Sequence, residues 1–268
     1  MFNMELTIFQ YLILGIVQGV TEWLPISSSG MGTLVMSNFY QITDVNFILR
    51  NLLFLHLGTF FAAFVYFFKD VKALTISTFK YKKAKPRTKK TIKFILISTI
   101  ITGIIGLVLM KFLTNINLEL TGKTITLLVA ALLLITGFVQ LKPSRKGFKR
   151  EENLKNKDSI FLGLMQGLAV IPGISRSGIT VSTFLMRKFD DTTALRLSFL
   201  MSLPVILLGN IFLNLNDMVL TTYSIFGLVA SFFFGFLTIH LLMKLSRRIN
   251  FAWFVIIFSV LMVLSVLI

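Results

Sequence analysis

The sequence contains no cysteine and few charged or histidine residues. Without cysteine, the chain has no disulfide, no thiolate nucleophile and no Cys-ligated metal. Two histidines in 268 residues are a weak signal for a His-ligated metal. Charged residues make up 14% of the chain and hydrophobic residues 55%, and the mean hydropathy is +0.84. A water-soluble fold could not bury so much apolar surface, so we predict a polytopic membrane protein.

The few charges are mostly of one sign and are unevenly placed. The chain has 27 Lys and Arg against 11 Asp and Glu, and 22 of the cations lie in four segments between apolar stretches. These segments are Lys69–Lys93, Lys142–Lys157, Arg187–Lys188 and Lys244–Arg248. Cytoplasmic loops of membrane proteins carry such an excess, which also attracts anionic lipid headgroups. We therefore expect membrane lipids as partners and no nucleic acid, because no aromatic residues are interleaved with the lysines.

Six apolar stretches are long enough, or nearly so, to cross a membrane, which takes roughly 20 residues. They are 47–68, 94–113, 124–141, 192–215, 223–243 and 251–268. Two further apolar segments, 6–37 and 159–186, are interrupted near the middle by sequence that contains proline and serine. We expect these two segments to be re-entrant helical hairpins in an all-α protein with six membrane spans.

The basic segments determine the side from which each hairpin enters the membrane. Span 47–68 is followed directly by Lys69, so it runs from outside to inside, and residues 38–44, which lack Lys and Arg, lie outside. With the N-terminus outside as well, hairpin 6–37 enters from the outer face. Hairpin 159–186 lies between two basic segments and enters from the inner face. The two hairpins thus point at each other.

The two hairpin sequences are copies of one another. The stretch that starts at Leu14, LGIVQGVTEWLPISSSG, aligns without a gap on the one that starts at Leu162, LGLMQGLAVIPGISRSG, at an offset of 148. Copies in opposite orientation are typical of inverted-repeat folds, whose broken helices meet near the midplane. We predict a first repeat at 1–141, a basic cytoplasmic linker at 142–158 and a second repeat at 159–268. Broken backbone at that depth predicts a polar cavity between the turns.

Two charged residues lie at the interruptions of the hairpins. Glu22 is the one acidic residue within an apolar segment, and Arg176 lies in the second interruption, between two serines. Because an isolated buried charge is costly, we expect Glu22 to pair with Arg176 across the repeat axis. The Arg176 guanidinium, flanked by hydroxyls and free backbone N–H groups, also suits a phosphate ligand. The alternative is that Glu22 and Arg176 form a purely structural ion pair.

Other polar residues near the interruptions have two interpretations. The serines at 27–29 either cap the returning half-helix or face the cavity. Gln18 lies one turn before Glu22 and shares its helix face. His56, in the first span, is either a hydrogen-bonded core residue or a neighbour of the cavity. Glycines four residues apart recur in both hairpins and indicate close helix packing: Gly15, Gly19, Gly163 and Gly167.

Three stretches together resemble the undecaprenyl-diphosphate phosphatase family of the bacitracin-resistance type: QGVTEWLPISSSG, PGISRSGIT and LHLGTFFA. The resemblance runs through nearly the whole chain. It implies a plasma-membrane enzyme that hydrolyses a C55 polyprenyl diphosphate to the monophosphate and so recycles a lipid carrier of cell-wall synthesis. It also implies a divalent cation, Mg²⁺ or Ca²⁺, a homodimer, and a site that opens to the outer face.

The resemblance implies roles for residues in both interruptions. Glu22, Ser28 and Arg176 are expected to be catalytic, and Glu22 with Gln18 to hold the cation. Substrate binding is assigned to the polar residues around them, which are Gln18, Ser27, Ser29, His56, Ser175, Ser177 and Thr180.

One residue departs from the family pattern. The family usually has a histidine directly after the glycine that follows the serines, and this chain has Met31, whose thioether is neither nucleophile nor base. Three hypotheses follow. In the first, Ser28 or a metal-bound water attacks, with Glu22 as base or metal ligand and Arg176 stabilising the phosphoryl group. In the second, His56 replaces the missing histidine. In the third, the site binds a polyprenyl phosphate without hydrolysis, as in a flippase.

Overall fold

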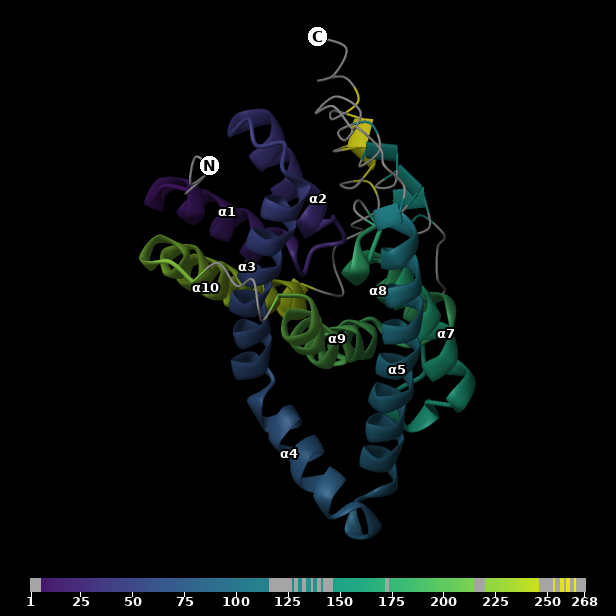
Figure 1. The fold of residues 1–268 in the computed structure, drawn as a ribbon. Coiled ribbons are helices and arrows are strands. Elements are labelled where there is room, and N and C mark those ends of the chain that lie inside the picture. Colours follow the sequence, from purple (N-terminus) through teal and green to yellow (C-terminus); the bar gives the residue numbers. More distant parts are fainter. Residues whose placement is uncertain are drawn as a thin grey trace.

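The computed structural model describes residues 6–115, 147–171, 174–214 and 220–245, with single residues between 127 and 141 and between 253 and 263. Every named element in these ranges is a helix (Figure 1), which confirms the all-α prediction for them. The elements are α1 (Ile8–Thr21), α2 (Ser28–Leu34), the π-helical turn η1 (Val35–Phe39), α3 (Val45–Tyr66), α4 (Phe68–Phe79), η2 (Tyr81–Lys83), α5 (Pro86–Asn115), η3 (Glu151–Asn153), α7 (Asn156–Leu168), α8 (Arg176–Met186), α9 (Asp191–Asn214) and α10 (Thr222–Leu245).

Four of these helices, α3, α5, α9 and α10, are long and apolar enough to cross a membrane. They match four of the predicted spans, and several apolar helices of this kind make the chain a multi-pass membrane protein. The two remaining predicted spans, 124–141 and 251–268, fall largely outside the described residues.

The first hairpin is broken in its middle, as the sequence predicts. After α1 the chain turns over residues 22–26, which include Pro25, and α2 begins after Ser27. The Ser27 hydroxyl caps α2 by accepting a hydrogen bond from the Gly30 N–H at 3.1 Å. With 14 residues, α1 is about 21 Å long, shorter than the roughly 30 Å hydrocarbon core. These dimensions suit a re-entrant hairpin, and both its re-entrant course and the side from which it enters the membrane stay predictions.

The second hairpin repeats this geometry in α7 and α8. Ser175, at the position equivalent to Ser27, caps α8 by accepting a hydrogen bond from the Gly178 N–H, also at 3.1 Å. Residues 172 and 173 of the predicted break lie outside the described residues. The duplication read from the sequence therefore extends to the helix cap.

Each hairpin packs on the half of the chain to which it does not belong. α1 lies along α10, and α7 lies along α5 (Figure 1). A Cβ atom on Gly19 would lie 2.8 Å from Ser231 O and from Gly235 N, and one on Gly167 would lie 2.7 Å from Ile105 Cβ. Only glycine permits such approaches, so the glycines serve helix packing, as predicted, and interlock the two repeats.

The basic segment after the first span is largely helical rather than an irregular loop. It forms α4, η2 and the first turns of α5. Ion pairs hold this end together: Arg196 binds Asp70 through contacts of 2.5 and 3.1 Å and also pairs with Glu151, which accepts from Arg87 Nε at 2.8 Å. Arg196 therefore has a structural role, because it joins α9 to α4 and to the turn before α7.

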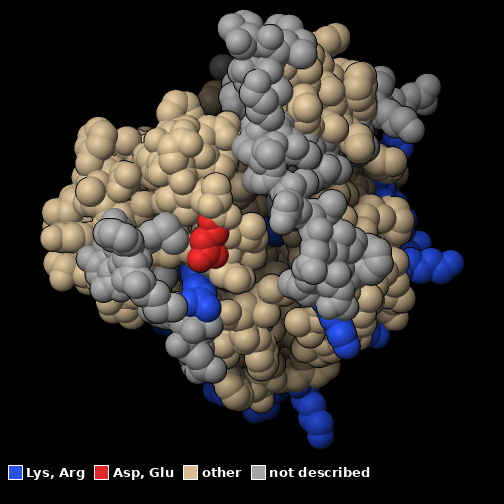
Figure 2. All heavy atoms as spheres, turned by 45° about the horizontal axis from the view of Figure 1, so that its top comes forward, with Lys and Arg blue, Asp and Glu red and all other residues tan. Residues whose placement is uncertain are grey.

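Charge is segregated over the surface. Figure 2 brings forward the end of the molecule that lies opposite α4, and most of the described residues on this face are uncharged. Its Lys and Arg side chains lie mainly at the right and lower edges of the view. Segment 69–93 meets the turn at 151–153 through Arg87 and Lys90, whereas residues 142–146 and 246–248 lie outside the described residues, so the prediction that all four segments share one side of the membrane stays a prediction.

Candidate active site

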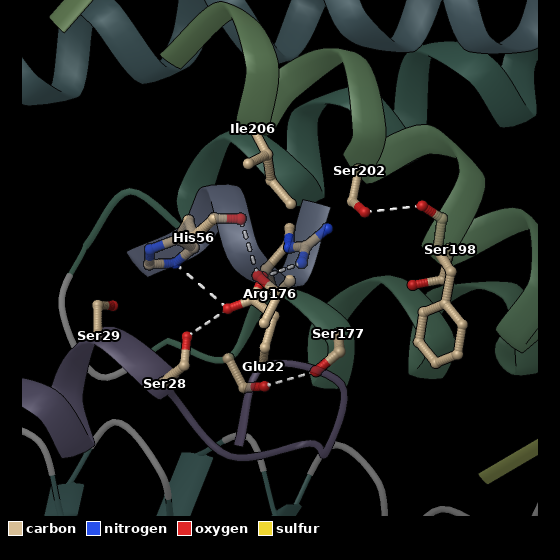
Figure 3. A network of polar contacts seen from close by, with 12 residues as sticks. Glu22, Ser28, Ser29, His56, Arg176, Ser177, Ser198, Ser202 and Ile206 are labelled. Atoms are coloured by element: carbon tan, nitrogen blue, oxygen red, sulfur yellow. Dashed lines mark hydrogen bonds and ion pairs between the residues drawn. The ribbon is translucent and has the colours of Figure 1, made fainter. Parts of the chain in front are cut away.

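Glu22 lies at the centre of a cluster of polar side chains (Figure 3). Its Oε2 atom accepts hydrogen bonds from Ser28 Oγ at 2.5 Å and from Gln18 Nε2 at 2.9 Å, and His56 Nε2 lies 3.2 Å away. Its Oε1 atom pairs with Arg176 Nη2. Four residues predicted for the site, from α1, α2, α3 and α8, therefore meet at one carboxylate that is only 5% exposed.

Local structure explains how the first hairpin supplies three of these groups. Gln18 and Glu22 are four residues apart on α1 and its C-cap, so their side chains lie on one face. The turn that contains Pro25 reverses the chain and returns Ser28, the first residue of α2, to the same carboxylate. The proline that breaks the helix thus also brings a hydroxyl to the acid.

His56 contacts Glu22 through one ring nitrogen and the backbone through the other. His56 Nδ1 lies 2.6 Å from Leu52 O, and since a carbonyl only accepts, Nδ1 carries a proton. Nε2 faces a carboxylate oxygen, and two unprotonated acceptors would repel each other. The His56–Glu22 pair therefore carries two protons: one on Nδ1, and a second one between Nε2 and the carboxylate.

Arg176 is held by Trp23 as well as by Glu22. The guanidinium carbon lies 5.5 Å from the centroid of the Trp23 ring, a cation–π contact, and Trp23 is 1% exposed. Among the described residues, the guanidinium donates only from Nη2, so its other N–H groups remain for an anionic ligand. Sequence reasoning assigned Trp23 no role, although its position directly after the buried acid is a usable signal.

The polar residues of the second hairpin bind other parts of the protein. Ser177 Oγ donates to Leu24 O at 2.5 Å, and Ser175 Oγ lies 3.2 Å from Ser177 Oγ. Thr180 Oγ1 lies 2.6 Å from Ser198 Oγ on α9. These contacts join α8 to the first turn and to α9, and the predicted role of the three residues in substrate binding stays a prediction.

The remaining residues of the SSSGM stretch lie beside the cluster. Ser27 serves as the cap of α2, and Ser29 Oγ lies 3.4 Å from Ser27 Oγ, with no bond to Glu22 (Figure 3). Met31 packs on an apolar cluster with Ile26, Leu34 and Ala130. The imidazole next to the Glu22 carboxylate is therefore that of His56 on α3, and residue 31 lies in an apolar cluster instead.

Oxygen atoms of Gln18 and Glu22 fit a hard divalent cation. Gln18 Oε1 is buried and has no hydrogen-bond partner among the described residues. Amide and carboxylate oxygens are ligands that Mg²⁺ and Ca²⁺ prefer. The described part of the chain has no group of three or more His, Asp or Glu that could hold a metal ion. The remaining ligands would therefore be phosphate oxygens of the substrate and water, as is usual for Mg²⁺.

Known proteins are similar to this chain over most of its length. A protein of Methanococcoides burtonii named "Undecaprenyl-diphosphatase" is 44% identical over 268 residues, which cover 97% of this chain and 98% of that protein. Proteins of the same name from Haloarcula marismortui and Treponema denticola are each 34% identical, over at least 90% of both chains. Residues 11–264 match the family described as "Bacitracin resistance protein BacA". The chain therefore belongs to the BacA family.

Proposed function

We infer that this chain is an undecaprenyl-diphosphatase, a membrane hydrolase that converts undecaprenyl diphosphate to the monophosphate and phosphate and so recycles a lipid carrier. Its family and the 44% identical relative of that name support this function. The observation that carries it in the structure is the meeting of a hydroxyl, a carboxylate and a guanidinium at Glu22. Together these groups provide a nucleophile, a base and a phosphate-binding cation.

We propose Ser28 as the nucleophile and Glu22 as its base. The 2.5 Å hydrogen bond from Ser28 Oγ to Glu22 Oε2 points the hydroxyl proton at the carboxylate. Ser28 Oγ would attack the terminal phosphorus, its proton would move to Glu22, and the lipid monophosphate would leave as an anion. The proton on Glu22 would pass to that leaving group. Water would then attack the phosphoserine, and the carboxylate would accept a proton from the water and return it to Ser28 Oγ as the bond from Oγ to phosphorus breaks and phosphate is released.

Arg176 would bind the phosphoryl group that is transferred. Its unused N–H groups match phosphate oxygens, and Trp23 and Glu22 fix the plane of the guanidinium before substrate arrives. Negative charge is spread over the equatorial oxygens in the transition state, so a cation that is held in place beside them lowers the barrier.

His56 would take the place of the histidine that Met31 replaces. Its contact with Glu22 keeps the base oriented, and the additional proton of this pair can be passed to a departing oxygen. Met31 itself packs on Ile26, Leu34 and Ala130, and this apolar packing agrees with the assignment of the histidine's role to His56.

A bound Mg²⁺ or Ca²⁺ would neutralise negative charge on the diphosphate. Gln18 and Glu22 are the residues that would hold it, as the unpartnered Gln18 Oε1 supports. The site would open to the outer face of the plasma membrane, which the position of the lysine-rich α4 and the start of α5 at one end of the molecule supports (Figure 1). The family resemblance supports a homodimer.

The test is release of phosphate from undecaprenyl diphosphate by the purified protein in detergent with Mg²⁺. We expect turnover by the wild type and a loss of about 10²–10³-fold in Arg176→Ala. Arg150→Ala, which removes an arginine that is 77% exposed, is the matched control and should keep the wild-type rate. No phosphate release, together with exchange of lipid phosphate across proteoliposomes, would instead establish the flippase alternative.

A further inference from the structure

A small open pocket lies where α5 meets the start of α7, at the end of α7 away from the hairpin turn. It is lined by Lys90, Lys93, Phe94, Leu154, Lys155, Asn156 and Ser159. We propose that this pocket binds a phosphoryl anion, either free inorganic phosphate or the phosphate of an anionic lipid headgroup.

The charge around the pocket is positive. Lys90 Nζ donates to Glu152 O at 2.5 Å, which fixes its ammonium group at the rim. The side chains of Lys93 and Lys155 form no ion pair within the described part of the chain. The nearest carboxylate on α7, Asp158, is already paired with Arg187. Three ammonium groups therefore line one pocket with little local neutralisation.

Ser159 supplies a hydroxyl that lines the pocket and has no partner among the described residues. The residue is 2% exposed and lines the pocket, and its hydroxyl makes no hydrogen bond to any described residue. Because this hydroxyl lines the pocket, it can donate to a ligand oxygen there. The Lys155 side chain makes no capping hydrogen bond, and the Asp158 carboxylate in the first turn of α7 accepts from the Lys155 N–H at 2.8 Å.

In the first repeat, the position equivalent to this pocket is filled by a side chain. At the offset of 148, Ser159 corresponds to Tyr11 and Lys155 to Thr7. The Tyr11 ring is buried and its hydroxyl donates to Asn51 at 2.7 Å, and Thr7 caps α1. In the second repeat a small serine stands where the ring is, and a lysine stands where the cap is. The sequence difference thus leaves a pocket beside a lysine where the first repeat has a buried ring beside a threonine.

The experiment is a lysine-acylation footprint of the full chain in nanodiscs, read by mass spectrometry. One arm uses phosphatidylcholine discs with and without inorganic phosphate, and the other adds phosphatidic acid to the discs. We expect the acylation rates of Lys93 and Lys155 to fall at least about fivefold in one arm, while that of Lys72, an exposed lysine of α4, stays constant. Protection by phosphate in neutral discs identifies the free anion, and protection only with phosphatidic acid identifies the headgroup.

Ser159→Ala is the matched variant, because it removes only the hydroxyl and leaves a small residue on α7. We expect it to weaken the protecting ligand about tenfold and to leave hydrolysis of undecaprenyl diphosphate unchanged, so that this test is independent of the proposed function. The proposal is overturned by no protection in either arm, by equal protection of Lys72, which indicates general screening, or by unchanged affinity in Ser159→Ala.

Discussion

Ser28 Oγ lies 2.5 Å from Glu22 Oε2, and the two residues are joined by the turn that breaks the first hairpin. The hydroxyl and the carboxylate are therefore in place before any substrate is present. Gln18 and His56 bind the same oxygen and restrict the carboxylate to one orientation. Such preorganisation is what a nucleophile and its base require.

The glycines that interlock the repeats give a stability prediction. In Gly19→Ala the new methyl group would lie 2.8 Å from backbone atoms of Ser231 and Gly235, which cannot rotate away, so α1 and α10 must separate. We expect a loss of about 1–3 kcal/mol, seen as a lower Tm in detergent. Gly103→Ala, where nothing lies within 4 Å, is the control and should gain about 0.5–1 kcal/mol from helix propensity. Equal shifts in the two variants would contradict the packing account.

The ion pairs at the lysine-rich end give a second stability prediction. Asp70→Asn removes the charge that Arg196 binds through two contacts, and the two side chains are only 30% and 28% exposed. We expect a loss of about 2 kcal/mol, between the values for exposed and buried pairs. Arg150→Gln breaks a 4.0 Å pair with Asp190 in which the arginine is 77% exposed, and its Tm should not change measurably. An Asp70→Asn variant as stable as Arg150→Gln would refute this role of Arg196.

Replacement of His56 tests whether it has taken over from the histidine that the family usually has. His56→Phe removes the proton shared with Glu22. If the free energy of this charge-assisted hydrogen bond is lost from the transition state, kcat should fall about ten- to a hundredfold. His240→Phe is the control, since His240 is exposed on α10 and lies beside the Tyr66 ring. If both variants turn over at the wild-type rate, His56 is a packing residue only.

Removal of the divalent cation should abolish phosphate release, and added Mg²⁺ should restore it. Gln18→Leu deletes the unpartnered oxygen, so we expect the Mg²⁺ concentration for half-maximal activity to rise about tenfold. Gln166→Leu is the internal control: Gln166 occupies the equivalent position and also has an unpartnered Oε1, but Val170 stands in place of the carboxylate. A cation requirement that is the same in both variants would place the metal elsewhere.

Several features of the site follow from the sequence alone. The pairing of Glu22 with Arg176 was predictable because an unpaired charge in an apolar segment is costly and only one acid was available. The two serine caps and the glycine contacts follow from local rules for helix ends and close packing. Each of these predictions depends on a short stretch or on the duplication.

Other features depend on contacts that a single sequence does not encode locally. A lone histidine in a span gives no sign of the direction in which it faces, so the contact of His56 with Glu22 had to be seen in the structure. The exchange of hairpins between the two halves joins α1 to α10 and α7 to α5, far apart in the chain. The contact of α4 with α9 depends on the pairing of Asp70 with Arg196, which lie 126 residues apart.

The most direct measurement compares the initial rates of phosphate release from undecaprenyl diphosphate by Ser28→Ala and Ser29→Ala. The two serines are neighbours of the same type, but only Ser28 is bonded to Glu22. We predict that Ser28→Ala loses about 10²–10⁴-fold in kcat, whereas Ser29→Ala stays within about threefold of wild type. A Ser28→Ala protein that keeps the wild-type rate would contradict the account, because the hydroxyl on Glu22 would then take no part in the reaction.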